Sequence, residues 1–221
     1  MTDKATKATS VRGVFSWPKL DKPDDKYNKY SCNLIVDADG LEAMSEILKA
    51  PFDAAVEAGR EADAERKTAA RKKNPFSVND WFTPVYDEDT EEETGNFIIK
   101  FSATGSGTKK DGTPWKRGPI PCFDGLGNPF KAPEKIWSGS EGKVSFTYRP
   151  YFIAGTGVAG LSLQLSAVQV LELNSGGGGT ADSHGFGVED DGFDGSSITS
   201  SAETEESDDT EGVDADAASD F

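Results

Sequence analysis

The chain has 221 residues, a formal net charge of −16 and a mean hydropathy of −0.54, values that suggest that part of it does not fold into a core. No run of about 18 apolar residues is present and the first ten residues lack an apolar segment, so neither a membrane span nor a secretory signal is expected. One histidine and two cysteines without a C-x-x-C spacing argue against a zinc site and favour free thiols in a reducing compartment.

The chain before residue 174 reads mainly as β-structure. Residues 10–17 and 29–36 are rich in β-branched and aromatic side chains and predict two strands, and residues 96–103 predict a third. Residues 119–123 fit a short edge strand, because their two prolines cannot donate to a ladder.

A helical insertion is predicted at about residues 41–73. Leu41, Met44 and Leu48 recur at helical spacing, and the basic run 66–73 suits a helix C-terminus. Pro51 is expected to end one helix and open another, because proline fits a first turn but not a helix interior.

The clearest strands are residues 143–153 and 160–173, joined by a glycine-rich hairpin loop. A change of phase near residues 166–167 predicts a β-bulge. Five or six strands with one helical insertion favour a small closed barrel, although a sandwich fits the pattern as well. Three of the apolar side chains are assigned to the core: Phe146, Leu163 and Leu165.

The C-terminal segment differs in composition from the rest. Four consecutive glycines within residues 174–183 cannot specify a helix or strand, so we place a boundary there, with a folded domain at 1–174 and a disordered tail at 175–221. The tail contains 14 of the 39 acids and no lysine or arginine, which leaves 25 acids against 23 bases in residues 1–174.

Basic and aromatic side chains are interleaved in the folded part. Residues 100–149 hold nine bases against four acids. Single strands are bound by stacking bases on aromatic rings beside cations that contact phosphates. A Gly/Pro-rich loop supplies one such group: Lys109, Lys110, Trp115, Lys116 and Arg117. The alternative for Trp115 is that it caps the end of a barrel.

Three further groups have the same character. Trp17 and Lys19 end the first strand, where core packing is an equal alternative for the tryptophan. Tyr30 forms another group, together with Tyr27, Lys26 and Lys29. Arg149 and Tyr151 share one face of a strand, whereas Tyr148 should point to the other face. Trp81 and Phe82 are interpreted as packing residues.

Catalytic patterns are missing from the sequence, and neither an enzymatic activity nor a cofactor is expected. There is no G-x-S-x-G, no P-loop and no cluster of metal ligands. The acidic run 87–93 could hold a cation, but exposed acids without spaced ligands favour solvated charge.

The ordered segments resemble the OB-fold, acidic-tailed single-stranded DNA-binding proteins of tailed bacteriophages. The resemblance is carried by VRGVFSWPKL, CFDGLGNPF, KVSFTYRPYFI, GVAGLSLQLSAVQVLEL and the terminal Asp220–Phe221. It implies an OB-fold-like Greek-key barrel that binds single-stranded DNA without sequence preference, in the cytoplasm of the infected bacterial host. No membrane partner is implied.

The resemblance also implies a role for the tail. Asp214, Asp216, Asp220 and Phe221 would contact replication and recombination proteins, such as a DNA polymerase or a helicase-primase, and the tail would compete with DNA or support a homodimer. A tail of acids imitates a polyanion, and solubility alone has no use for a terminal aromatic residue.

Two other functions remain open from the sequence. A virion or scaffold-type protein-interaction module would assemble without nucleic acid. An RNA-binding OB protein would distinguish its ligand through the 2′-hydroxyl.

Overall fold

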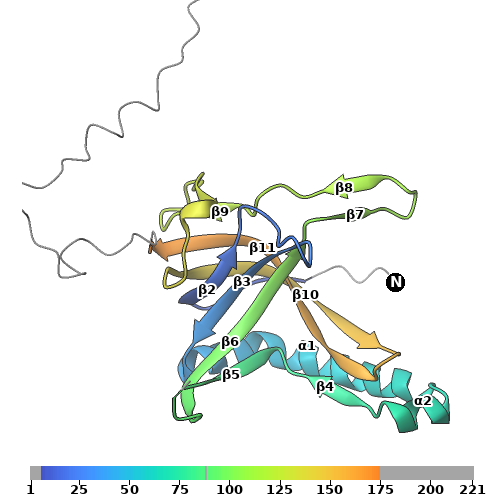
Figure 1. The fold of residues 1–221 in the computed structure, drawn as a ribbon. Helices are drawn as coiled ribbons and strands as arrows, with labels where there is room; N and C mark the ends of the chain where they lie inside the picture. Colours follow the sequence, from blue (N-terminus) through green and yellow to red (C-terminus); the bar gives the residue numbers. More distant parts are fainter. Residues whose placement is uncertain (1–5, 88, 175–221) are drawn as a thin grey trace, which may run out of the picture. The chain divides into compact units, whose positions relative to one another are not determined.

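A computed structural model describes residues 6–87 and 89–174 (Figure 1). Its elements, in chain order, are β1 Thr6–Thr9, β2 Gly13–Lys19, β3 Lys29–Val36, α1 Ala38–Ala64, α2 Thr68–Lys73, β4 Ser77–Asn79, β5 Phe82–Tyr86, β6 Glu93–Thr104, β7 Ser106–Thr108, β8 Pro114–Lys116, β9 Cys122–Phe123, the 3-10 helix η1 Pro133–Lys135, β10 Glu141–Ile153 and β11 Val158–Glu172. The tail predicted at 175–221 lies outside the described residues.

Five strands close into a barrel. Antiparallel pairs join β2 to β3, β3 to β6, β10 to β11 and β10 to β2, and a parallel pair joins β6 to β11. This order is that of an OB-fold Greek-key barrel, so the predicted barrel is confirmed and the sandwich is not formed. Shorter strands extend the edges: β1 pairs with β10, β4 and β9 pair with β11, and β5 pairs with β6.

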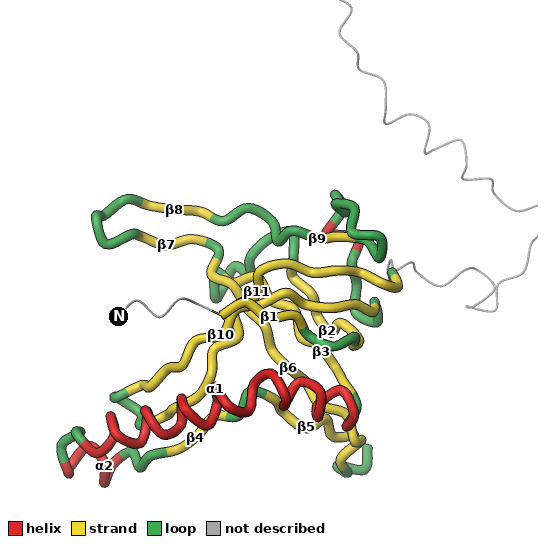
Figure 2. The backbone as a smooth tube through the Cα atoms, turned by 180° about the vertical axis from the view of Figure 1, so that it is seen from behind, coloured by secondary structure: helices red, strands yellow, loops and turns green. Residues whose placement is uncertain are grey.

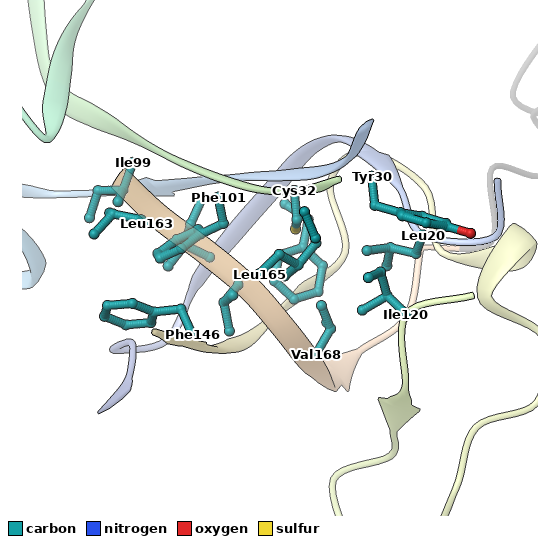
Figure 3. Packing of buried hydrophobic residues seen from close by; sticks show 14 of the residues in the cluster. Leu20, Tyr30, Cys32, Ile99, Phe101, Ile120, Phe146, Leu163, Leu165 and Val168 are labelled. Carbon is teal, nitrogen blue, oxygen red and sulfur yellow. The ribbon is translucent and has the colours of Figure 1, made fainter. Parts of the chain in front are cut away.

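The barrel interior is filled by the alternating side chains of these strands (Figure 3). Phe146, Leu163 and Leu165 are buried there, as predicted. Trp81 is buried, and its ring meets Phe82 edge-on at 4.9 Å, which confirms both as packing residues. Bringing these apolar surfaces together out of water supplies the main driving force for closing the barrel.

The bulge predicted near residues 166–167 is present in β11. Ser145 of β10 pairs with Ala167 and Phe146 pairs with Leu165, so Ser166 has no residue opposite it. Beyond the barrel, β10 and β11 continue as a two-stranded arm that ends at the turn 154–157 (Figure 1).

Helix α1 lies along this arm, as seen from behind in Figure 2. It begins after Asp37, whose carboxylate accepts a hydrogen bond from the Gly40 N–H at 2.8 Å.

The prediction that Pro51 separates two helices is wrong, because α1 runs through it without interruption to Ala64. Proline costs the helix one backbone hydrogen bond, but buried Leu48 and Ala55 anchor the turns on either side of it. No helix of the described residues is long and apolar enough to span a membrane.

Candidate nucleic-acid interface

A hollow of about 370 Å³ lies on the outer face of the barrel, where β6 and β11 run parallel and Ser102 pairs with Gln164. We call it the barrel groove. Its floor is mostly polar and its charged members are both basic. Eleven residues line it: Lys29, Ser102, Ala103, Thr104, Trp115, Arg117, Thr147, Ser162, Gln164, Leu165 and Ser166.

Arg117 is held at the edge of the groove through its main chain. Its N–H donates to the Gly105 carbonyl at 2.7 Å, and its own carbonyl accepts from the Tyr30 hydroxyl at 3.1 Å. Its side-chain Nε donates to the Thr104 carbonyl at 3.2 Å. The guanidinium therefore has a defined place beside the groove while its remaining donors face solvent, as a phosphate ligand requires.

Trp115 enters the groove from the β7–β8 hairpin, which projects away from the barrel (Figure 1). Its indole lies against Gly107, where an added Cβ would stand only 3.0 Å from Nε1. Lys109 and Lys110 are exposed toward the hairpin tip, and Lys116 is exposed on β8. The hairpin thus brings the predicted loop residues together, but only Trp115 and Arg117 among them line the groove.

The groove face continues along β10. Arg149 stands directly opposite Ser162, a groove residue, and Tyr151 stands opposite Gly160. Residues opposite one another on antiparallel strands share a face, so both predicted residues lie on the groove face of the arm, although neither lines the groove itself. The Tyr151 hydroxyl accepts a hydrogen bond from Asn79 Nδ2 at 2.9 Å, which fixes the ring.

Sequence reasoning missed a second hollow, of about 250 Å³, on the same face. Lys7 of β1 and Lys143 of β10 line it, together with Ser145. Lys143 and Ser145 lie on the same face of β10 as Thr147 of the groove, because alternate residues of a strand share a face. This alternation could have identified Lys143 from the sequence. Lys7 left no such signal, because β1 is short and forms only by pairing with β10.

Trp17 lies in neither hollow, although its ring is 77% exposed. It occupies a bulge of β2 between Ser16 and Lys19 and has a φ of 49°, a left-handed conformation that is strained for a bulky residue. Trp137, 53% exposed, is a near neighbour, since the Trp17 N–H donates to the Ser138 hydroxyl at 2.8 Å. Core packing of Trp17, the alternative left open above, is therefore excluded.

Lys19 is engaged by a carboxylate. It forms an ion pair with Asp24, and this hydrogen bond is the main reason that the pKa of Asp24 is lowered. A phosphate at this position would have to compete with Asp24 for the ammonium group, so Lys19 contributes less free charge than the sequence indicated.

Tyr30 requires a correction. It was expected to stack on a base, but it is 2% exposed and packs beside Leu20 and Ile120 at one end of the core (Figure 3). A ring without an exposed face cannot receive a base. Its hydroxyl instead holds the edge of the groove in place, because it donates a hydrogen bond to the Arg117 carbonyl.

Other predicted features do not contribute a described site. Asp214, Asp216, Asp220 and Phe221 lie outside the described residues. In the acidic run, the Asp87 carboxylate accepts from the N–H groups of Thr90 and Asp89, which lowers its pKa and closes a turn. Within residues 6–87 and 89–174, no group of three metal-ligating side chains occurs.

Comparison with known proteins yields one consistent result. A family model described as single-stranded DNA-binding protein, bacteriophage T7, matches residues 17–173. A single-stranded DNA-binding protein of Enterobacteria phage T3 is 28% identical over 163 residues, which are 74% of this chain and 68% of that protein. The crystal structure of gp2.5, a single-stranded DNA-binding protein encoded by bacteriophage T7, has a TM-score of 0.61 at 23% identity and covers 87% of this chain and 100% of its own. The single-stranded DNA-binding protein of bacteriophage Enc34 in complex with single-stranded DNA has a TM-score of 0.45 at 17% identity, covering 76% of this chain and 87% of its own.

Proposed function

Since the chain belongs to the family of bacteriophage T7 single-stranded DNA-binding proteins, we propose that it binds single-stranded DNA without sequence preference in the barrel groove. The observation that carries this proposal is the meeting of Trp115, Arg117 and Lys29 around a polar floor. An indole stacks on any base, and the two cations reach phosphates, which are the same at every nucleotide.

Charge explains how a protein of net charge −16 binds a polyanion. The groove lining contains Lys29 and Arg117 and no acid, and the second hollow adds Lys7 and Lys143 without an acid. The phosphates respond to this local field, whereas the net charge is dominated by the tail and the acidic run. Binding therefore releases counterions and weakens as salt rises, by about 0.7 in logarithmic slope per phosphate neutralised.

We further propose that the protein protects single strands during replication and recombination of phage DNA in the cytoplasm of the infected host, without catalysis of its own. The C-terminal acids compete with DNA for the groove when no strand is present. Once DNA displaces them, Phe221 and its neighbouring carboxylates recruit a replication protein such as a DNA polymerase or helicase-primase. Linkage to the same chain would give the tail an effective concentration on the order of millimolar.

The test is a tryptophan-fluorescence titration with poly(dT), on the full chain and on a version that ends at Asn174. We expect quenching in both, with tighter binding by the truncated protein. Quenching with equal affinity would remove the competing role of the tail. Absence of quenching in both would refute the groove, and tighter binding of a matched RNA strand would identify an RNA-binding protein.

A further inference from the structure

The corner at which α1 meets α2 carries five bases with no acid between them, within residues 66–73. None of these bases lies in the last turn of α1, which ends at Ala64. Attraction to a helix C-terminus accounts only for the bases in the last turn of α2, a helix of six residues with a small dipole. Three of the five bases, Arg71, Lys72 and Lys73, lie in that turn, so this weak attraction leaves Arg66 and Lys67 to be explained in another way.

Buried ionic contacts fix the shape of the corner. The Arg66 and Asp63 side chains are each 6% exposed and form an ion pair, and Arg66 Nη1 donates to the Asn74 carbonyl at 3.1 Å. Arg71 Nε donates to the second Asp63 oxygen at 3.1 Å. Asp63 is thereby neutralised from two sides, so its charge does not offset that of the surface lysines.

Three lysines at this corner, Lys67, Lys72 and Lys73, are exposed. None of them takes part in an ion pair among the described residues. Their ammonium groups are therefore available to bind an external anion. A hollow lies beside this basic run. Apart from Asp63, the nearest acids before the run are Glu61 and Glu65, and neither of them lines this hollow.

That hollow has a volume of about 320 Å³ and combines cations with an aromatic ring. Arg71, Lys72 and Phe76 line it together with Asp63, the acid already paired with Arg66 and Arg71. Arg60 lies over the Phe76 ring with 5.3 Å between Cζ and the ring centroid. This is the same pairing of positive charge and aromatic surface that lines the barrel groove.

The corner is joined to the groove by the β10–β11 arm. Asn74 Nδ2 donates to the Gly155 carbonyl at 2.7 Å, and the Ser77 N–H donates to the Gly157 carbonyl at 3.0 Å. Gly157 has a φ of +77°, and a Cβ there would stand 2.5 Å from Arg66 Nη1, so the turn is closely fitted to the corner. From Ser162 in the groove to Val158, which pairs with Ser77, the strand advances roughly 13 Å at about 3.3 Å per residue.

We propose that this basic corner is a second contact for single-stranded DNA, which takes the phosphates of a strand leaving the barrel groove along Arg149 and Tyr151. This inference rests on the proposed function, because it extends the same bound strand. Lysine is suited to the role, since it contacts phosphate as a flexible point charge and reads no base. The corner lengthens the binding site without adding sequence preference.

The test compares two double variants of the full-length protein. Lys72→Gln/Lys73→Gln removes two charges at the corner, and Lys131→Gln/Lys135→Gln removes two exposed charges that line neither groove nor corner. Glutamine keeps the helix propensity of lysine, so folding should be preserved. Each protein is titrated over a range of salt with oligo(dT) of about 6 nucleotides and of about 30, chosen around the roughly 4–16 that one OB fold occupies.

We expect the corner variant to bind the long strand more weakly, with its logarithmic salt slope reduced by about 1.4 for two phosphates, and to bind the short strand as the wild type does. The control should match the wild type on both. An unchanged slope on the long strand, or an equal loss on both lengths, would overturn the corner contact and leave the groove in place. A wild-type protein that binds neither strand would overturn the proposed function, and this inference with it.

Discussion

The Tyr30 hydroxyl donates a hydrogen bond to the Arg117 carbonyl at 3.1 Å, across 87 positions of the sequence. One partner belongs to the barrel core and the other to the edge of the groove. The bond fixes the backbone of Arg117 independently of its guanidinium, which stays available to a ligand. A residue that cannot touch DNA therefore positions one that lines the candidate binding groove.

Tyr30→Phe should test this positioning role. The ring still fills the core, but the Arg117 carbonyl loses its donor, so we expect unfolding to become easier by about 0.5–1.5 kcal/mol. DNA binding should weaken without a change in salt slope, because no cation is removed. Urea denaturation and DNA titration measure the two effects. Tyr27→Phe is the matched control, since the Tyr27 side chain is 65% exposed, and an equal effect there would contradict the role of Tyr30.

Trp115→Leu should separate stacking from charge. Leucine retains apolar bulk against Gly107 but offers no aromatic face, and the loss of one stacked base corresponds to about 1–3 kcal/mol of binding free energy. Fluorescence polarisation of labelled oligo(dT) gives the affinity. Trp137→Leu serves as the comparison, because Trp137 is exposed but lines no part of the groove. Equal affinities of the two variants would exclude Trp115 as the stacking platform.

The strained backbone at Trp17 predicts an unusual order of stability. Within a strand, alanine normally gives a more stable protein than glycine does. At a φ of 49°, however, any side chain costs about 1–2 kcal/mol of stability, which glycine avoids. After the greater entropy of unfolded glycine is subtracted, Trp17→Gly should be more stable than Trp17→Ala by about 0.5–1 kcal/mol. Chemical denaturation of both variants measures this, and the reverse order would refute the left-handed conformation.

The same two variants test the predicted stacking of a base on Trp17. Both lack the indole, so both should bind poly(dT) more weakly than the wild type and to the same extent. Wild-type affinity in both variants would exclude Trp17 as a stacking platform.

The buried thiols predict a loss of stability at high pH. Burial raises the pKa of Cys122 from 9.0 to about 11, and burial also raises that of Cys32. Below pH 9.0 the Cys122 thiol is neutral in both folded and unfolded protein and has no effect. As pH rises from 9.0 toward 11, the unfolded protein loses this proton first, so unfolding becomes more favourable.

Cys122→Ala measures the contribution of this thiol. Denaturation of the variant and the wild type at several pH values gives two curves, and subtraction removes the other titrating groups. The wild type should lose more stability than the variant between pH 9.0 and about 11. Parallel curves would contradict the raised pKa.

Local patterns in the sequence were sufficient for the five strands of the barrel and much of the core. The alternation of β10 and β11, and the phase change at Ser166, are determined by neighbours along the chain, so the hairpin and its bulge could be predicted. The polar, aromatic loop around Trp115 was identified for the same reason. Pro51 misled the prediction, because propensity is local whereas the packing of Leu48 and Ala55 against other elements is not.

Only the tertiary structure decided which of these residues meet. Tyr30 and Trp17 both belonged to sequences of aromatic and basic residues, yet barrel closure buried one ring and a bulge exposed the other. Lys7 joined Lys143 because β1 pairs with a strand more than a hundred residues away. The sequence by itself determined the five strands of the barrel, the alternation of their faces and the distribution of charge, since these depend on adjacent residues. The groove and the basic corner depend on strand order and register, which are determined by contacts between distant segments.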